Sequence, residues 1–392
     1  MRLAERSESL LPERREGAGE VNPVELFFDL VYVLAITQLT HYLVAHLTLR
    51  GALETLVLLL AVWAAWIHIV WTTNYFDLGP RSVRLALIGV MLVSLVMSAS
   101  LPEAFEERGL VFAAALVVIL VGWSLLVLVV VGHRHPLSAV FVRVLVWMVV
   151  SGALLLAGGL AAGDTRLALW LVAVGLLFTV VWLRFPVPLL GRSRTTDYTI
   201  TGEHMAHRCY LFIILALGES ILIVGADFGR LPLSAGTVAA FLVAFTSTVT
   251  FWWIYFDRAE EAGAQVIAQA RDPGGLALSA YTYYHIPMVT GIVAAAAAVD
   301  LTIAHPTESA TVATTLLILG GPILFLVGHS LFKWALWHHV PRSRLVAGGA
   351  LAALALLAVV SSLLVLLTAA TFVLVVLASW TVRADRRRSA EP

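Results

Sequence analysis

The amino-acid sequence is divided into apolar runs of about 20 residues, the length that a helix needs to cross roughly 30 Å of hydrocarbon. In lipid every backbone N–H and C=O group needs an internal partner, so such runs form either helices or a closed β-barrel. The runs are continuous rather than alternating, which excludes the barrel. With 60% hydrophobic and 13% charged residues, the chain of 392 residues is expected to be an all-α, polytopic transmembrane helix bundle in a lipid bilayer.

The apolar runs predict about 12 spans. They are placed at about 26–47, 53–73, 83–101, 110–131, 139–160, 167–183, 209–228, 236–256, 278–299, 311–332, 345–361 and 363–381. The last stretch, from Leu345 to Trp380, has no polar break. As one helix it would be roughly 54 Å long, too long for one crossing. Two short helices that turn near Ser361 and Ser362 fit better.

The positive charges predict the orientation. With the N-terminus inside, 21 of the 25 basic residues fall on the inner side, and the four outside are Arg50, Arg108, Arg166 and Arg230. Cytoplasmic loops retain Lys and Arg, so both termini are expected in the cytoplasm of a cell (plasma or inner) membrane protein. The predicted parts are a disordered cytoplasmic tail, a six-helix half, a cytoplasmic linker, a second six-helix half and a basic cytoplasmic tail, at residues 1–24, 25–184, 185–203, 204–382 and 383–392.

A repeat appears at a spacing of about 180 residues. The second span ends at Trp71 and a Tyr-Phe-Asp sequence that closes with Asp77, and the eighth ends with the same three residues, closing with Asp257. Six spans per half give the two halves the same orientation, as in parallel-repeat transporters. The first and seventh spans would be matching helices. Aromatic residues are common at span ends, so a chance match is the alternative.

The first span carries two carboxylates, Glu25 and Asp29, one turn apart on one helical face with Tyr32 and Thr40. A charge in hydrocarbon costs a few kcal/mol, so such groups are candidates for function. Two neighbouring carboxylates repel each other when both are ionised, which suits a proton-binding pair. The alternative is that both reach the interface, where Glu25 caps the helix N-terminus.

The seventh span carries Glu219 near its centre, which makes it the deepest carboxylate in the chain. Gly218 beside it would let another helix approach closely. His204 and Arg208 fall near the same helical face, closer to the cytoplasm. The alternative for Glu219 is a structural hydrogen bond from a protonated carboxyl group, which a glutamine would provide at less cost.

Two histidines lie in spans at a depth close to that of Asp29. His68 shares a face with Trp71, and His285 precedes Pro287, which frees a backbone carbonyl and can kink the helix. The shared depth predicts a cluster, whereas each histidine alone suits a neutral hydrogen bond between helices. No metal-binding, phosphate-binding or serine-hydrolase motif is present, so neither a metal nor a cofactor is expected. The net charge of zero does not favour nucleic acid.

Two segments resemble a known family. Residues 21–39 (VNPVELFFDLVYVLAITQL) and 204–220 (HMAHRCYLFIILALGES) resemble the opening and central motifs of the bacterial low temperature requirement protein A (LtrA) family. His207 departs from the pattern, which has Glu before the Arg. The resemblance implies a polytopic membrane protein linked by name to growth in the cold and implies no substrate. The first span also resembles that of a potassium-channel family with six-span repeats, but the second half lacks that motif.

The preferred hypothesis is a secondary transporter for a small solute or ion. Its site would be lined by Asp29, His68, Glu219 and His285, and Glu219 would carry the coupling proton or cation. The alternatives are an ion channel with the first and seventh spans at its pore, and a structural or sensory membrane protein. An enzyme is not expected, because no nucleophile–base pair stands out. The sequence predicts neither the substrate nor the oligomeric state.

Overall fold

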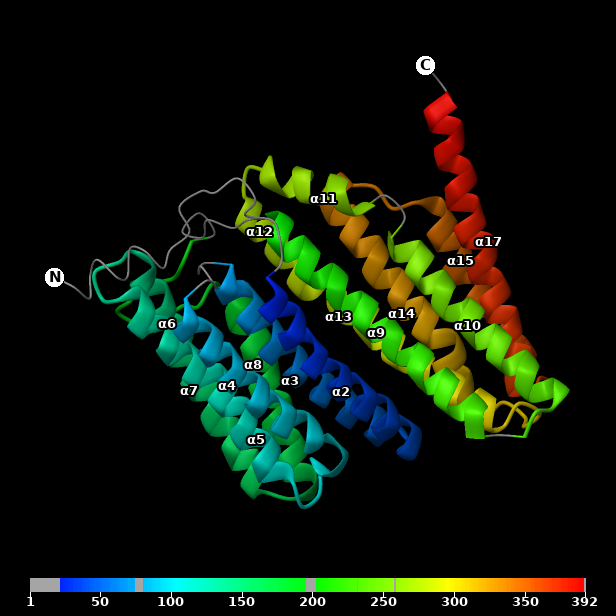
Figure 1. The fold of residues 1–392 in the computed structure, drawn as a ribbon, viewed down its shortest axis with the longest axis horizontal. Helices are drawn as coiled ribbons and strands as arrows, with labels where there is room; N and C mark the ends of the chain where they lie inside the picture. The colour runs from blue at the N-terminus through cyan, green and yellow to red at the C-terminus, as the bar shows by residue number, and fades with distance from the viewer. Residues whose placement is uncertain (1–21, 75–79, 195–201, 231, 257–258, 391–392) are drawn as a thin grey trace. The chain divides into compact units, whose positions relative to one another are not determined.

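The computed structural model describes residues 22–74, 80–194, 202–230, 232–256 and 259–390 (Figure 1). Within these ranges the secondary structure is helical, apart from two isolated β-bridges. The predicted all-α polytopic bundle is therefore confirmed. Residues 1–21 of the predicted N-terminal tail and 195–201 of the predicted linker lie outside the described residues.

Eleven helical segments of the described chain are long and apolar enough to cross a membrane. Two of them contain a short π-helical stretch. The eleven are α2 (Pro23–Ala45), α3 (Leu49–Thr73), α4 (Arg81–Ala99), α5–η2–α6 (Gly109–Val117, Val118–Gly122 and Trp123–Val131), α7 (Leu137–Leu160), α8 (Gly163–Trp182), α9 (Gly202–Arg230), α10 (Ala235–Phe256), α12–η4–α13 (Pro273–Ala277, Leu278–Tyr283 and His285–Ala304), α14 (Val312–Trp337) and α17 (Leu363–Ala390, apolar to Arg383). The shorter elements are η1 (Leu101–Glu103), α11 (Ala259–Ala268), α15 (Arg342–Ala353) and α16 (Ala355–Ala358).

Over the predicted span at 345–361 the chain forms α15 and α16, which meet at Leu354, and this segment is not among the eleven that are long and apolar enough to cross a membrane. The predicted break at Ser361 and Ser362 is present, because α17 begins at Leu363. The turn pairs with the loop between α13 and α14: Ala310 N donates to Ser361 O at 3.0 Å. This contact returns the chain to the level at which α14 begins, so α15 and α16 together run antiparallel to α14. The number of twelve crossings stays a prediction.

The chain divides into two compact units. One comprises Met1–Leu39, Leu53–Arg208 and Ala268–Ala277, and the other comprises Thr40–Ala52, Cys209–Ile267 and Leu278–Pro392. The division passes through α2 and α9 rather than through the predicted linker. The predicted six-helix halves and their parallel repeat stay a prediction.

In the second unit, α13 and α14 pack backbone against backbone at glycines. A Cβ atom placed on Gly291 would lie 2.5 Å from Gly321 O and 2.6 Å from Phe325 N, and one on Gly328 would lie 2.8 Å from Tyr284 O. Small residues at helix contacts allow this close approach in membranes. The sequence does not separate these glycines from others, because their spacing is not distinctive.

In the first unit, a buried arginine satisfies the carbonyl groups at the end of α7. Arg166 of α8 donates five hydrogen bonds of 2.6–3.2 Å to the carbonyl oxygens of Gly158, Ala161, Ala104 and Glu106. The last carbonyls of a helix have no partner within the helix, so they need an outside donor. Arg166 therefore joins the end of α7 to the chain that follows α4.

Replacing Arg166 by methionine is expected to reduce the free energy of unfolding by about 3 kcal/mol, because carbonyl groups are left without donors. The measurement is thermal unfolding in detergent, followed by tryptophan fluorescence. The control is Arg230→Met at the exposed end of α9. Equal unfolding midpoints for the two variants would contradict the role of Arg166.

Candidate functional site

Hydrogen bonds at the N-terminus of α2 position the carboxylate of Glu25. Asn22 caps the helix: its Oδ1 accepts from Val24 N at 3.2 Å, and its own N–H donates to Glu25 Oε2 at 3.1 Å. Pro23 occupies the first helical position, where no N–H is needed. The Glu25 side chain binds back to the N-cap N–H as in a capping box, whereas the Asn22 side chain accepts from the second helical residue rather than the third. This arrangement positions Glu25 in the first turn, where its side chain is buried.

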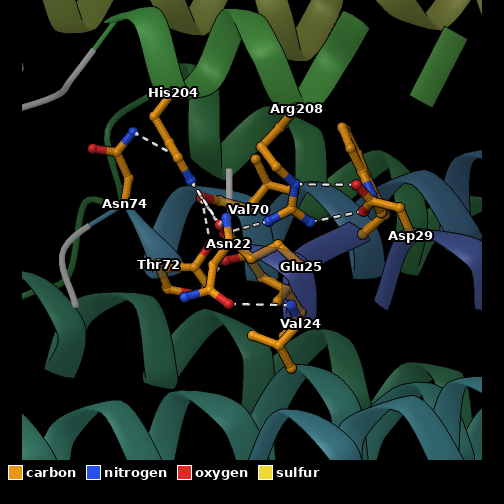
Figure 2. Close-up of polar contacts among 12 residues, drawn as sticks. Asn22, Val24, Glu25, Asp29, Val70, Thr72, Asn74, His204 and Arg208 are labelled. Atoms are coloured by element: carbon orange, nitrogen blue, oxygen red, sulfur yellow. Dashed lines mark hydrogen bonds and ion pairs between the residues drawn. The ribbon is translucent and has the colours of Figure 1, made fainter. Parts of the chain in front are cut away.

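Arg208 of α9 bridges both carboxylates of α2 (Figure 2). Its Nη2 donates to Asp29 Oδ1 at 2.7 Å, its Nε donates to Asp29 Oδ2 at 3.1 Å, and its Nη1 donates to Glu25 Oε1. The contact with Asp29 is bidentate, the strongest form of an arginine–carboxylate pair. Arg208 and Asp29 are both 0% exposed, and Glu25 is 2% exposed. The three charges are therefore shielded from solvent.

His204 lies one turn before Arg208 and contacts the same carboxylate. Its Nε2 is 3.1 Å from both Glu25 oxygens, and its Nδ1 is 3.4 Å from Asn74 Nδ2 (Figure 2). A carboxylate only accepts, so Nε2 carries a hydrogen and donates it. Glu25 is thus shared between Arg208 and His204.

Two aromatic residues enclose the cluster. Trp66 of α3 donates its indole N–H to Asp29 Oδ1 at 2.7 Å, and the Phe28 ring lies 5.7 Å from the Arg208 guanidinium carbon. Both side chains are fully buried. Asp29 accepts three hydrogen bonds from described residues, which is the usual condition for a charge to be buried.

The four residues Glu25, Asp29, His204 and Arg208, called the ion cluster below, carry unequal charges. Two carboxylates face one guanidinium, so the net charge is −1 when His204 is neutral. One added proton makes the ion cluster neutral. A buried group of charges that is one proton short of neutrality can bind a proton.

The structure brings together four residues that the sequence singled out, on two helices with matched spacing. Glu25 takes part in the helix cap, as one of the two interpretations predicts, and it also pairs with the buried Arg208, which was not predicted. Its role in proton binding stays a prediction. Trp66 and Asn74 were not predicted. Trp66 lies in the second span, where Trp63 is as deeply buried, and Asn74 directly follows that span, so neither position singles out a residue of the ion cluster.

The other predicted site residue of the first unit, His68, has its own partner. His68 Nε2 lies 3.0 Å from Ser124 Oγ of α6. Thr72, one turn on, accepts from Trp123 Nε1. Trp71, which shares this stretch of α3, is half-buried. No described hydrogen bond joins His68 to Asp29, so the predicted common cluster of these two residues is absent from the described contacts.

In the second unit, His285 is held by a tyrosine and a carbonyl group. Tyr255 OH lies 2.9 Å from His285 Nε2, and His285 Nδ1 donates to Ala280 O at 2.8 Å. Because Nδ1 carries the hydrogen, Nε2 accepts from Tyr255. The helix departs from α-geometry over η4, in the turns just before Pro287. The predicted kink at Pro287 stays a prediction.

Glu219 is 4% exposed on α9, and no described residue forms a hydrogen bond or an ion pair with its carboxyl group. The expectation of close helix packing at Gly218 is not met, because a Cβ atom there would meet no described heavy atom within 4 Å. The predicted residues Asp77 and Asp257 lie outside the described residues. In the described part of the chain, no group of three His, Cys, Asp or Glu side chains could hold a metal ion.

Comparison with known proteins gives two matches. The profile of the bacterial low temperature requirement A protein (LtrA) matches residues 20–379. An uncharacterized protein of Rhizobium meliloti (strain 1021) is 39% identical over 306 residues, which cover 78% of this chain and 75% of that protein. No solved structure matches the chain. The matched range contains all four residues of the ion cluster and nearly the whole helical bundle, so the chain belongs to the bacterial low temperature requirement A (LtrA) family.

Proposed function

We propose that this LtrA-family protein is a permease of the cell membrane. It would move a small solute or ion, use a proton bound at the ion cluster as the coupling ion, and catalyse no chemical reaction. The observation that carries the proposal is a fully buried arginine that bridges two carboxylates inside apolar helices, with a histidine on one of them. A charge imbalance of this kind is expensive to hold in a membrane protein, so it points to function.

The contacts assign different roles to the two carboxylates. Asp29 is held by both the guanidinium and Trp66, so it keeps Arg208 in place. Glu25 is shared by a permanent cation and a titratable one. When His204 gains a proton, its attraction for Glu25 rises and competes with Arg208 for the same carboxylate. Proton binding would thus alter how α2 and α9 are joined at their first turns.

In the predicted orientation, the first turns of α2 and α9 lie at the cytoplasmic side. The ion cluster would then exchange its proton with the cytoplasm. A solute transported together with a proton would be taken up or released from that side. This arrangement suits a secondary transporter, which couples solute movement to a proton gradient.

The test uses purified protein in liposomes that contain a pH-sensitive dye. A potassium diffusion potential drives protons inward, first without solute and then with a panel of amino acids, sugars, organic acids and monovalent ions. We expect one member of the panel to raise proton entry above that of protein-free liposomes. His204→Gln should lower this entry on the order of 100-fold, since it removes the proton-transfer group.

The matched control is His68→Gln, which changes a histidine of the same unit with a serine partner outside the ion cluster. It should leave proton entry unchanged. Proton entry that is equal in His204→Gln and the wild type would exclude the ion cluster from coupling. Large currents that do not saturate with ion concentration would instead identify a channel.

A further inference from the structure

A groove with a volume of about 600 Å³ lies between α14 and α15 in the second unit. One wall is a face of α14 from Ile323 to Trp334, and the other is a face of α15 from Arg344 to Gly349. The lining residues of each helix follow the three- and four-residue spacing of a single helical face. The volume falls in the range of about 300–1,000 Å³ that is usual for small-molecule sites.

Most of the groove presents apolar surface. The one hydroxyl group on the α14 wall is satisfied by its own helix, because Ser330 Oγ donates to Leu326 O at 2.6 Å. Gly348 and Gly349 form part of the α15 wall, and a Cβ atom on either would meet no described heavy atom within 4 Å. The two glycines therefore leave space beside α14 that a hydrocarbon chain can fill.

Positive charge lies at the end of the groove near the turn that joins α14 to α15. Arg344 lines the groove and is 3% exposed, and its Nε donates to His329 Nδ1 at 3.3 Å, which positions the guanidinium. Residues 309–384 contain no acidic residue, so neither α14 nor α15 brings a carboxylate to the groove. Trp334 lines the same end, and tryptophans are common at the level of lipid headgroups. This end of the groove suits an anionic headgroup.

The length of the groove matches one leaflet of a bilayer. Ile323 and Trp334 are eleven residues apart on α14, which is about 16 Å along the helix. The hydrocarbon core is about 30 Å thick, so one leaflet contributes about half of it. In the predicted orientation the turn after α14 lies on the cytoplasmic side, where anionic lipids give the membrane a negative surface potential.

We propose that this groove binds one anionic phospholipid of the cytoplasmic leaflet. An acyl chain lies between α14 and the two glycines of α15, and the headgroup phosphate accepts hydrogen bonds from Arg344. A free phosphate ion would leave the apolar length of the groove empty, and a neutral lipid would leave the charge of Arg344 unmatched. The inference goes beyond the proposed function, and it needs neither a solute nor a proton gradient.

The test is native mass spectrometry of the full-length protein in detergent, titrated with dioleoyl phosphatidylglycerol or dioleoyl phosphatidylcholine. The two lipids have the same acyl chains and differ in net charge. The first phosphatidylglycerol should bind at least about tenfold more tightly than the first phosphatidylcholine. Arg344→Gln should remove about tenfold of this affinity, as expected for the loss of a charge-assisted hydrogen bond.

A second variant tests the apolar part of the groove and keeps every charge. Gly348→Phe places a ring in the groove and should abolish the tight binding of phosphatidylglycerol. Its control is Gly175→Phe on α8, another helical glycine with open space around its Cβ position, which should leave binding unchanged. The control for Arg344→Gln is Arg342→Gln, which removes an exposed charge of the same helix that does not line the groove.

Size-exclusion chromatography checks that each variant is folded. Equal affinities for the two lipids would overturn the proposal, and so would equal losses in Arg344→Gln and Arg342→Gln. Tight binding that persists in Gly348→Phe would show that the lipid lies elsewhere. A dimer of the wild type that Gly348→Phe separates into monomers would place a second copy of the chain in the groove instead of a lipid.

Discussion

Arg208→Met is expected to destabilise the protein by about 3–5 kcal/mol, the cost of breaking a buried ion pair by removing one partner. The methionine fills much of the space of the arginine stem, so the loss comes from charge rather than from packing. Glu25 and Asp29 would be left one turn apart, buried and without their cation. A loss of this size is a large fraction of the free energy of unfolding of a folded protein, which is only about 5–15 kcal/mol.

A second substitution distinguishes the effect of the lost positive charge from the effect of the changed side-chain shape at position 208. Asp29→Asn in the Arg208→Met background removes one of the two stranded charges and should recover part of the lost stability. The exposed pair of Arg108 and Glu103, 2.8 Å apart, provides the matched control. Arg108→Met should cost less than about 1 kcal/mol, as surface ion pairs usually do.

The measurement is unfolding in mixed micelles with increasing denaturing detergent. If Arg208→Met and Arg108→Met unfold at the same detergent fraction, the buried pairs contribute nothing. If Asp29→Asn instead lowers the stability of Arg208→Met further, charge imbalance is not the cause of the loss.

Much of the fold follows from local pattern. Apolar runs predict the helices because lipid leaves the backbone no other partners. The break at Ser361 and Ser362 follows from length alone, since one helix from Leu345 to Trp380 would exceed the bilayer. The residues of the ion cluster stand out in the sequence because charged side chains are rare inside apolar helices.

The pairing inside the ion cluster does not follow from local pattern. Glu25 and His204 meet only because two helices 179 residues apart share one register, and no local rule sets that register. Trp66 is a similar case, because a tryptophan in an apolar span is equally suited to lipid, to a helix contact or to Asp29. Sequence reasoning therefore identifies the charged residues but not the uncharged groups that hold them.

Two glycines show the same limit of sequence reasoning. Gly218 attracts notice because it precedes a buried carboxylate, yet a Cβ atom there would meet only open space. Gly291 lies in an unremarkable run of small residues, yet it contacts the backbone of α14. The two glycines differ in whether another helix packs against them, and the local sequence does not contain that information.

Gly291→Ala is expected to destabilise the second unit by about 3 kcal/mol or more, in the upper range for overpacked cores. The added methyl group would lie 2.5 Å from Gly321 O and 2.6 Å from Phe325 N. Both are backbone atoms of α14, so no side-chain rotation can relieve the clash. The helices would have to move apart, which would weaken the packing along their whole contact.

Gly218→Ala makes the same chemical change on α9, but it should increase the free energy of unfolding instead of reducing it. With no described atom within 4 Å of the new methyl group, the main effect is the higher helix propensity of alanine, about 0.5–1 kcal/mol in favour of folding. Thermal unfolding of the two variants side by side checks the pair. Because both replace a helical glycine by alanine, a difference in sign isolates the contact between α13 and α14. Equal midpoints would mean that those helices do not approach backbone to backbone.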